Sequence, residues 1–130
     1  MKRLFLVFSI LLANLAAFAG PIDDNCSTIY DSIIAGDISK AEDAASKVYA
    51  QKSACSATNL ADLAIIYHQL VTRYDYVLKT IDCYNSAVGK DSNAARARFT
   101  EKRVDMDAVA KNYNANLSKF QQAVSDSMNF

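Results

Sequence analysis

Between Asn59 and Val88 the chain reads NLADLAIIYHQLVTRYDYVLKTIDCYNSAV, with neither proline nor glycine. Apolar residues recur in this stretch at spacings of three and four, the heptad pattern of a helix with one buried face. The members of this stripe are Leu60, Leu63, Tyr67, Leu70, Tyr74, Val77, Ile81, Tyr84 and Val88. Gly89 then offers a C-terminal stop. The pattern predicts one continuous helix over residues 59–88, roughly 45 Å long from the helical rise.

Other helical segments flank this stretch. The spacing of apolar residues predicts helices over residues 24–35, 39–51 and 93–126, and Gly36 is expected to end the first of them. Chain breakers are scarce, with three glycines and one proline, which argues against many short strands and turns. We therefore predict an all-α fold. The expected architecture is a four-helix bundle, in which the two long helices form an antiparallel hairpin and the two short helices pack along it.

The N-terminal residues have the layout of a secretory signal peptide. Lys2 and Arg3 precede an almost wholly apolar run, and Ala17-Phe18-Ala19 supplies the small residues that signal peptidase requires. The run is short for a bilayer span, which needs ~20 residues, and no later segment is apolar enough to span. We expect residues 1–19 to be removed. Residues 20–130 should then form one soluble domain, exported to a bacterial periplasm or to the extracellular space of a eukaryote.

Three cysteines remain in the predicted mature chain, and an oxidising compartment favours the pairing of two of them. Cys26 opens the first helix and Cys55 follows the second, so a helical hairpin brings these two within disulfide range. Cys83 lies near the far end of the long helix, about 40 Å from Cys55 by the helical rise. The prediction is a Cys26–Cys55 disulfide, with Cys83 as a free thiol that is either a buried apolar residue or a reactive group.

Charge and motifs argue against several functional classes. The 14 cations and 14 anions balance, and loss of the signal peptide leaves the chain slightly acidic, which argues against nucleic-acid binding. The acidic residues, such as Asp37, Asp62 and Asp105, fall at helix starts and polar faces, where we expect them in solvent. His68 is the single histidine and has no cysteine or carboxylate at helical spacing. We therefore expect no catalytic constellation, no metal site and no cofactor.

Two groups of side chains are candidates for binding. The first is a cluster of cations at the start of the last helix, where the helix dipole favours anions instead. It is a candidate patch for an acidic partner or an anionic headgroup and consists of Lys90, Arg96, Arg98, Lys102 and Arg103. The second group is a set of tyrosines on the apolar stripes, candidates to line a site for a small ligand: Tyr67, Tyr74, Tyr84 and Tyr113. The structural alternatives are a mixed charged surface and an ordinary core.

Two short stretches resemble tetratricopeptide or Sel1-like helical repeats. Gly36-Asp37-Ile38, followed by Ala41, is similar to the turn between the helices of such a repeat. Tyr84-Asn85-Ser86-Ala87-Val88, with Asp91-Ser92-Asn93, is similar to the end of its second helix. The chain departs from the pattern because the first helix of the second unit needs about one extra turn to come into register, and because no proline follows Asp91. The resemblance implies helical hairpins with a concave groove that binds peptides.

The two architectures differ at one point in the chain. Repeat hairpins require a break near Arg73-Tyr74-Asp75, whereas the heptad pattern runs through that point and favours the continuous helix. With either architecture, we predict a small exported binding protein that acts through a helical face on a protein partner or by self-association. The alternative is a carrier that holds a small apolar ligand in a tyrosine-lined core. We do not expect an enzyme.

Overall fold

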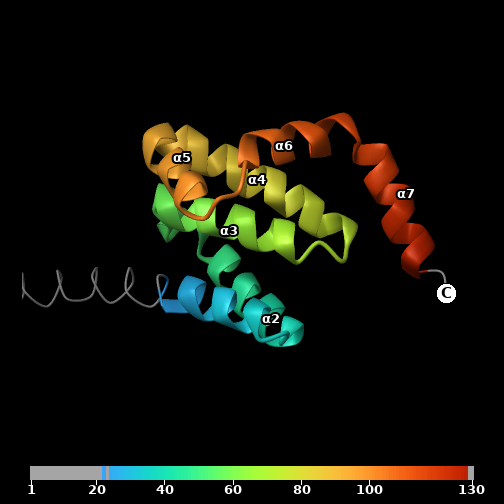
Figure 1. Ribbon diagram of the computed structural model, residues 1–130, viewed down its shortest axis with the longest axis horizontal. Coiled ribbons are helices and arrows are strands. Elements are labelled where there is room, and N and C mark those ends of the chain that lie inside the picture. Colours follow the sequence, from blue (N-terminus) through green and yellow to red (C-terminus); the bar gives the residue numbers. More distant parts are fainter. Residues whose placement is uncertain (1–21, 23, 129–130) are drawn as a thin grey trace, which may run out of the picture.

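The computed structural model describes residue 22 and residues 24–128, with side chains as far as residue 123 (Figure 1). Every regular element in this part of the chain is a helix, which confirms the all-α prediction. None of these helices combines the length and the apolar character that crossing a bilayer requires. The predicted signal peptide, residues 1–19, lies outside the described residues.

The chain is a succession of helices joined by short turns. Residues 24–34 form the first helix, and the later elements are α2 (Ile38–Ala50), a 3-10 turn (Lys52–Ala54), α3 (Ala57–Gln69), α4 (Tyr74–Lys90), α5 (Ser92–Glu101), α6 (Met106–Ala115) and α7 (Leu117–Met128). In Figure 1, the first helix and α2 lie on one side of α3. Helix α4 lies on the other side of α3, and α6 lies beyond α4. The last helix, α7, extends away from the body of the molecule.

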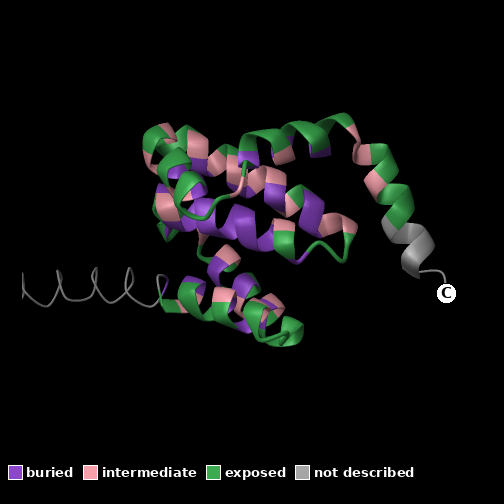
Figure 2. Ribbon diagram, in the orientation of Figure 1, coloured by how far each residue is buried: buried purple, intermediate pink, exposed green. Residues whose placement is uncertain are grey.

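The core is centred on α3. Residues 59–67 of this helix are all buried, and α2, α4 and α5 all pack against it (Figure 2). Its most extensive contact is with α4. Leu63, Ile65 and Ile66 have no exposed surface at all. A helix that is apolar on every side is one that other elements surround, so the molecule is built around one short helix.

The prediction of one continuous helix over residues 59–88 is wrong. The first half ends at Gln69, and residues 71–73 turn the chain so that α4 runs back along α3. The buried face of α4 consists of Tyr76, Val77, Thr80, Cys83 and Ala87, so Val77 is the one member of the predicted stripe that this helix buries. A straight helix would carry these side chains away from α3. The periodicity allows either a straight helix or a folded hairpin, and the burial of side chains in the tertiary structure decides between them.

The predicted helix over residues 93–126 is also interrupted. α5 ends in a Schellman motif, whose two hydrogen bonds run from the amides of Arg103 and Val104 to carbonyls of the last turn. Arg103 has the left-handed backbone that this motif needs, with φ 59°. Asp105 then caps α6 by accepting from a backbone amide of its first turn. A second break at Asn116 separates α6 from α7.

Arg103 occupies a conformation that glycine adopts more readily. The same motif ends the first helix at Gly36, as predicted, with φ 81°. A side chain in the left-handed region costs about 1–2 kcal/mol, and part of this cost is offset because glycine makes the unfolded chain more flexible. We expect Arg103→Gly to raise the free energy of unfolding by about 0.5–1 kcal/mol, measured by urea denaturation.

Lys111→Gly is the control for this change. Lys111 is an exposed residue inside α6, so glycine there should lower the free energy of unfolding by about 1 kcal/mol. Equal effects of the two substitutions would contradict the special role of residue 103.

Candidate functional site

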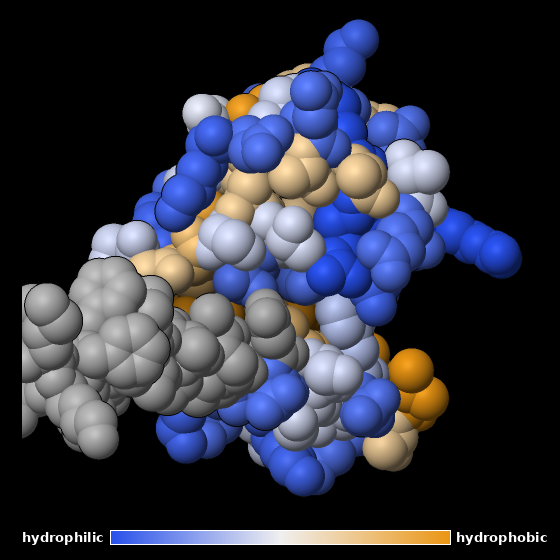
Figure 3. All heavy atoms as spheres, turned by 90° about the vertical axis from the view of Figure 1, so that its left-hand side faces the viewer, coloured by the Kyte–Doolittle hydropathy of each residue, from blue (hydrophilic) through white to orange (hydrophobic). Residues whose placement is uncertain are grey.

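A polar pocket of about 690 Å³ lies where the first helix, the start of α3 and the end of α5 meet. We call it the Asp62 pocket. Seen from this end of the molecule, hydrophilic residues cover most of the surface outside the grey atoms (Figure 3). The pocket is lined by Cys26, Ser27, Tyr30, Asp31 and Ile34 from the first helix, by Ser56, Thr58 and Asp62 from α3 and its cap, and by Arg98 and Lys102 from α5 and its cap.

A buried carboxylate lies among these lining residues. The side chain of Asp62 accepts a hydrogen bond of 2.8 Å from the Tyr30 hydroxyl, and its Oδ1 atom is 3.5 Å from Arg98 Nε. Burial raises the pKa of Asp62, although the Tyr30 hydrogen bond and the charges of Arg98 and Lys102 oppose that rise. Burial and the neighbouring carboxylate raise the pKa of Tyr30 as well. The pair therefore ties the first helix to α3.

Two cations of α5 complete the pocket. Arg98 forms an ion pair of 3.2 Å with Glu101, and its buried Nε has no hydrogen-bond partner among the described residues. Lys102 is exposed, and its ammonium lies 4.3 Å from the centre of the Tyr30 ring. A cation–π contact at an exposed site is worth only ~0.5–1 kcal/mol. A ligand can therefore bind Lys102 at a lower energetic cost than Arg98, which is held by its ion pair.

The structure distributes the five predicted cations over three places. Arg98 and Lys102 line the Asp62 pocket, whereas Arg96 and Arg103 line a second pocket of about 460 Å³. Lys90 donates a hydrogen bond of 2.6 Å to a backbone carbonyl at the end of the 3-10 turn. Residues two apart on a helix do not face each other, which separates positions 96 and 98. The basic cluster of the sequence is therefore not a single patch in space.

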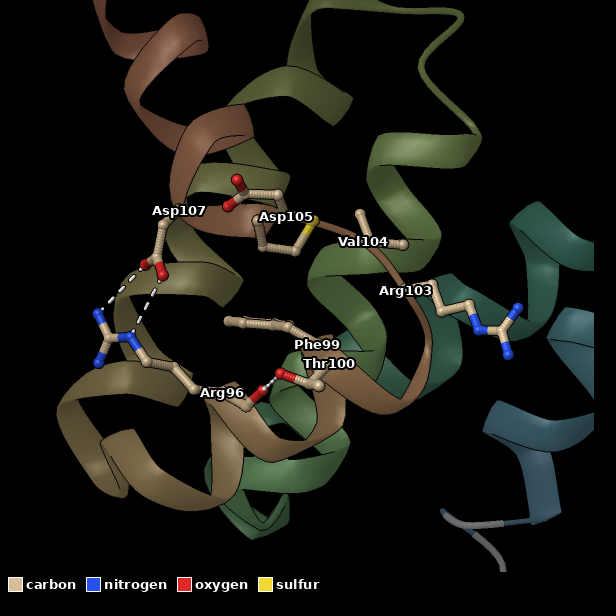
Figure 4. Close-up of a pocket in the computed structure, with 8 residues that line it drawn as sticks. Arg96, Phe99, Thr100, Arg103, Val104, Asp105 and Asp107 are labelled. Carbon is tan, nitrogen blue, oxygen red and sulfur yellow. Dashed lines mark hydrogen bonds and ion pairs between the residues drawn. The ribbon is translucent and has the colours of Figure 1, made fainter.

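The second pocket has internally paired charges. Arg96 is 3.1 Å from Asp107, and the Tyr84 hydroxyl donates to the same carboxylate. These hydrogen bonds hold the pKa of Asp107 below its usual value. Figure 4 shows Arg96 and Asp107 facing each other near the Phe99 ring, while Arg103 extends away from them. Because its charges already satisfy one another, this pocket is the weaker candidate for a charged ligand.

The four predicted ligand-lining tyrosines do not gather at either pocket. Tyr67 is buried in α3, Tyr74 begins α4, and Tyr84 stacks on an aromatic ring of α5. The Tyr113 hydroxyl lies 2.6 Å from His68 Nδ1, which joins α6 to α3. The turn at residues 71–73 separates Tyr67 from Tyr74 and Tyr84, which the sequence pattern placed on one stripe.

The predicted Cys26–Cys55 disulfide is not formed: the three cysteines are buried, and no disulfide joins any two of them. The thiol of Cys55 lies 3.5 Å from the carbonyl oxygen of Gln51 instead. Because α4 folds back along α3, Cys83 comes within electrostatic range of Cys55 and is not held at the far end of a long helix. Burial, with a contribution from Asp82, raises the pKa of Cys83 to about 12.

Asp62 and Tyr30 are the residues that sequence reasoning missed. Asp62 was expected in solvent, yet it is 4 % exposed. Its position was a usable signal, because it is the single charged residue in the apolar run 60–67, and an isolated charge in such a run needs a partner. Tyr30 carried no comparable signal, since its bond to Asp62 spans 32 positions of the chain.

The raised pKa of Asp62 makes stability depend on pH. Between the ordinary value of 3.8 and the higher folded value, the folded state keeps a proton that the unfolded state has released. The stabilisation that this bound proton gives is fully present below the ordinary pKa, and it is lost as the pH rises through the pKa of the folded state. We expect Asp62→Asn, which cannot titrate, to remove that fall in the free energy of unfolding, measured by urea denaturation from about pH 3 to 8.

Asp43→Asn is the matched control. Asp43 is exposed and forms a surface ion pair with Lys47, so the variant should keep the pH profile of the unchanged protein. A profile that is the same for Asp62→Asn and the unchanged protein would show that Asp62 titrates as an ordinary carboxyl.

Cys83 should react slowly in the folded protein. The thiolate is the reactive form, and a pKa of about 12 leaves only ~10⁻⁴ of the thiol ionised at pH 8. The side chain also has no exposed surface. We expect alkylation of Cys83 to be at least about 100-fold slower in native protein than in urea, measured by peptide mass spectrometry. Equal rates in the two conditions would contradict the buried position.

Comparisons with known proteins add no family to this picture. No protein-family model matches the chain, and no curated protein or solved structure is significantly similar to it. The likeness of residues 36–41 and 84–93 to helical repeats is therefore a resemblance of short motifs alone.

Proposed function

We propose that the protein is an exported interaction module of stacked helical hairpins, which holds a segment of a partner protein in the Asp62 pocket. The observation that carries the proposal is the origin of the pocket walls. The first helix, α3 and α5 are alternate helices along the chain, and each supplies polar side chains to the same hollow. A concave groove shared by successive hairpins is what the resemblance to tetratricopeptide and Sel1-like repeats implies.

The helix boundaries favour stacked hairpins over a four-helix bundle. Repeat hairpins require a break near Arg73-Tyr74-Asp75, and α4 begins at Tyr74. A bundle built on one long hairpin requires continuous helices over residues 59–88 and 93–126, and both of these ranges are interrupted. We therefore favour the architecture with a peptide groove.

The chemistry of the pocket suits a short polar segment. Its volume is that of a site for a few side chains and is too small for a folded domain. Lys102 offers positive charge to a carboxylate, while the hydroxyls of Ser27 and Thr58 offer hydrogen bonds to a peptide backbone. Ile34, which is 85 % exposed, offers an apolar contact among the lining residues.

The other expectations have less support. A carrier of a small apolar ligand needs a shared cavity for its lining tyrosines, and none of the four tyrosines lines either of the two pockets described above. Self-association remains a specific form of the same proposal, with a second copy of the chain as the partner. Export rests on the N-terminal sequence alone.

Photo-crosslinking from inside the pocket tests the proposal. A photoreactive amino acid replaces Ser27, an exposed lining residue, in the full chain expressed in its source cells. We expect a discrete adduct whose partner peptide is identified by mass spectrometry. Lys102→Glu in the same chain should reduce the adduct about tenfold, because a reversed charge disfavours the partner that the cation attracted.

Two controls make the result specific to the pocket. The photoreactive residue at Lys111, exposed on α6, should give no matching adduct, and Lys119→Glu should leave the Ser27 adduct unchanged. The same adduct from both probe positions, or an adduct insensitive to Lys102→Glu, would contradict the proposal. An adduct with a second copy of the chain would identify self-association.

A further inference from the structure

Three tyrosine rings from three helices surround a single ammonium group. The Nζ atom of Lys79 lies 5.1 Å from the ring centre of Tyr49 on α2, 5.5 Å from that of Tyr67 on α3, and 5.6 Å from that of Tyr76 on α4. The rings also contact one another, with centres 5.9 Å apart for Tyr49 and Tyr67 and 5.2 Å apart for Tyr67 and Tyr76. We call these three rings the tyrosine cage.

Hydrogen bonds fix the orientation of the cage. The Tyr49 hydroxyl donates to Asp82 at 2.8 Å, and the Tyr76 hydroxyl donates to Glu42 at 2.6 Å. Burial and these carboxylates raise the pKa of Tyr49 and of Tyr76 to about 12, so both rings are neutral phenols at physiological pH. The buried hydroxyl of Tyr67 has no hydrogen-bond partner among the described residues. The cage is therefore held in place before any external ligand binds.

The spacing of the cage is wide for a bare ammonium group. A methyl carbon touches ring carbons at about 3.5–4.0 Å and lies about 1.5 Å from its nitrogen. The nitrogen of a methylated ammonium thus sits roughly 5 Å from a ring that its methyl groups touch. The three distances from Lys79 Nζ match that spacing, yet Lys79 has no methyl groups to fill the intervening space. The lysine ammonium is also strongly hydrated, which weakens its preference for the cage.

Lys79 is held there by little else. Its nearest carboxylate is that of Asp75 at 3.8 Å, the long end of the ion-pair range, and its side chain is 29 % exposed. The same rings attract other cations, since the Arg73 guanidinium lies 5.0 Å from the centre of Tyr76 and the Lys52 ammonium 5.6 Å from that of Tyr49. The lysine therefore has a route to solvent and a small energetic reason to stay.

We propose that the tyrosine cage is a binding site for an alkylated ammonium group, and that Lys79 is a tethered occupant which such a ligand displaces. The tether gives Lys79 a high effective concentration, so the unchanged protein binds the ligand weakly. The cage shares no residue with the Asp62 pocket. The inference is therefore independent of the proposed function.

Tetramethylammonium is the probe, because it carries the ligand chemistry and nothing else. We expect it to shift the ring signals of the three tyrosines saturably in the NMR spectrum of the full-length Lys79→Ala protein, with a dissociation constant about tenfold lower than in the unchanged protein. Sodium chloride at the same ionic strength should give no such shift. Lys47→Ala, which removes an exposed cation of α2, should bind as the unchanged protein does.

Tyr76→Leu in the Lys79→Ala protein should abolish binding, since it removes one wall of the cage. If circular dichroism shows that Lys79→Ala does not fold, the unchanged protein is titrated with tetramethylammonium instead. Saturable shifts that sodium chloride does not produce then support the proposal. The absence of saturable shifts in the folded proteins would overturn the proposal, and so would binding that survives Tyr76→Leu. Choline and a peptide with trimethyllysine then distinguish a free cation from a protein side chain as the source of the group.

Discussion

Over residues 59–67 α3 has no face left for solvent, and the rest of the molecule supplies a partner for each of its sides. Because residues 59–67 are buried on every side of this 13-residue helix, other elements must enclose it within that short length. The chain achieves this by turning back after Gln69, which places α4 along α3, while α2 and α5 cover other sides. Burial of this one helix thus explains why the neighbouring helices are short and why they are separated by turns.

The same constraint produces both candidate sites. A helix with no solvent face must bury its polar groups too, and α3 carries Asp62 and Tyr67 among its apolar side chains. Asp62 lines the polar pocket beside Tyr30, and the Tyr67 ring forms one wall of the cage around Lys79. Burying a polar group is costly unless other polar groups surround it. Asp62 is therefore surrounded by polar side chains from other elements, whereas Tyr67 contributes the face of its ring to the cage.

The sequence predicts the helices better than it predicts the turns between them. Gly36 was identifiable as a helix end because glycine readily takes the left-handed backbone found there, whereas Arg103 takes the same backbone without any sign in its residue type. The turn at residues 71–73 contains neither glycine nor proline. The heptad spacing continues through this turn without a break, so periodicity did not reveal it, and α4 buries Tyr76, Thr80 and Cys83 instead of most of the stripe residues. The expected separation of about 40 Å between Cys55 and Cys83 followed from choosing the straight helix.

Polar bonds over long sequence separations then determine how the first two helices dock on the body. Tyr49 and Lys52 both bond to Asp82, and Tyr76 bonds to Glu42, across 30 to 34 positions of the chain. Each such bond contributes only ~1 kcal/mol net, so the energy of docking comes mainly from apolar side chains at the interface. Directed bonds tolerate less misalignment than apolar contacts do. The core therefore supplies the affinity of the two parts for each other, and the tyrosine–carboxylate bonds select the alignment in which the cage forms.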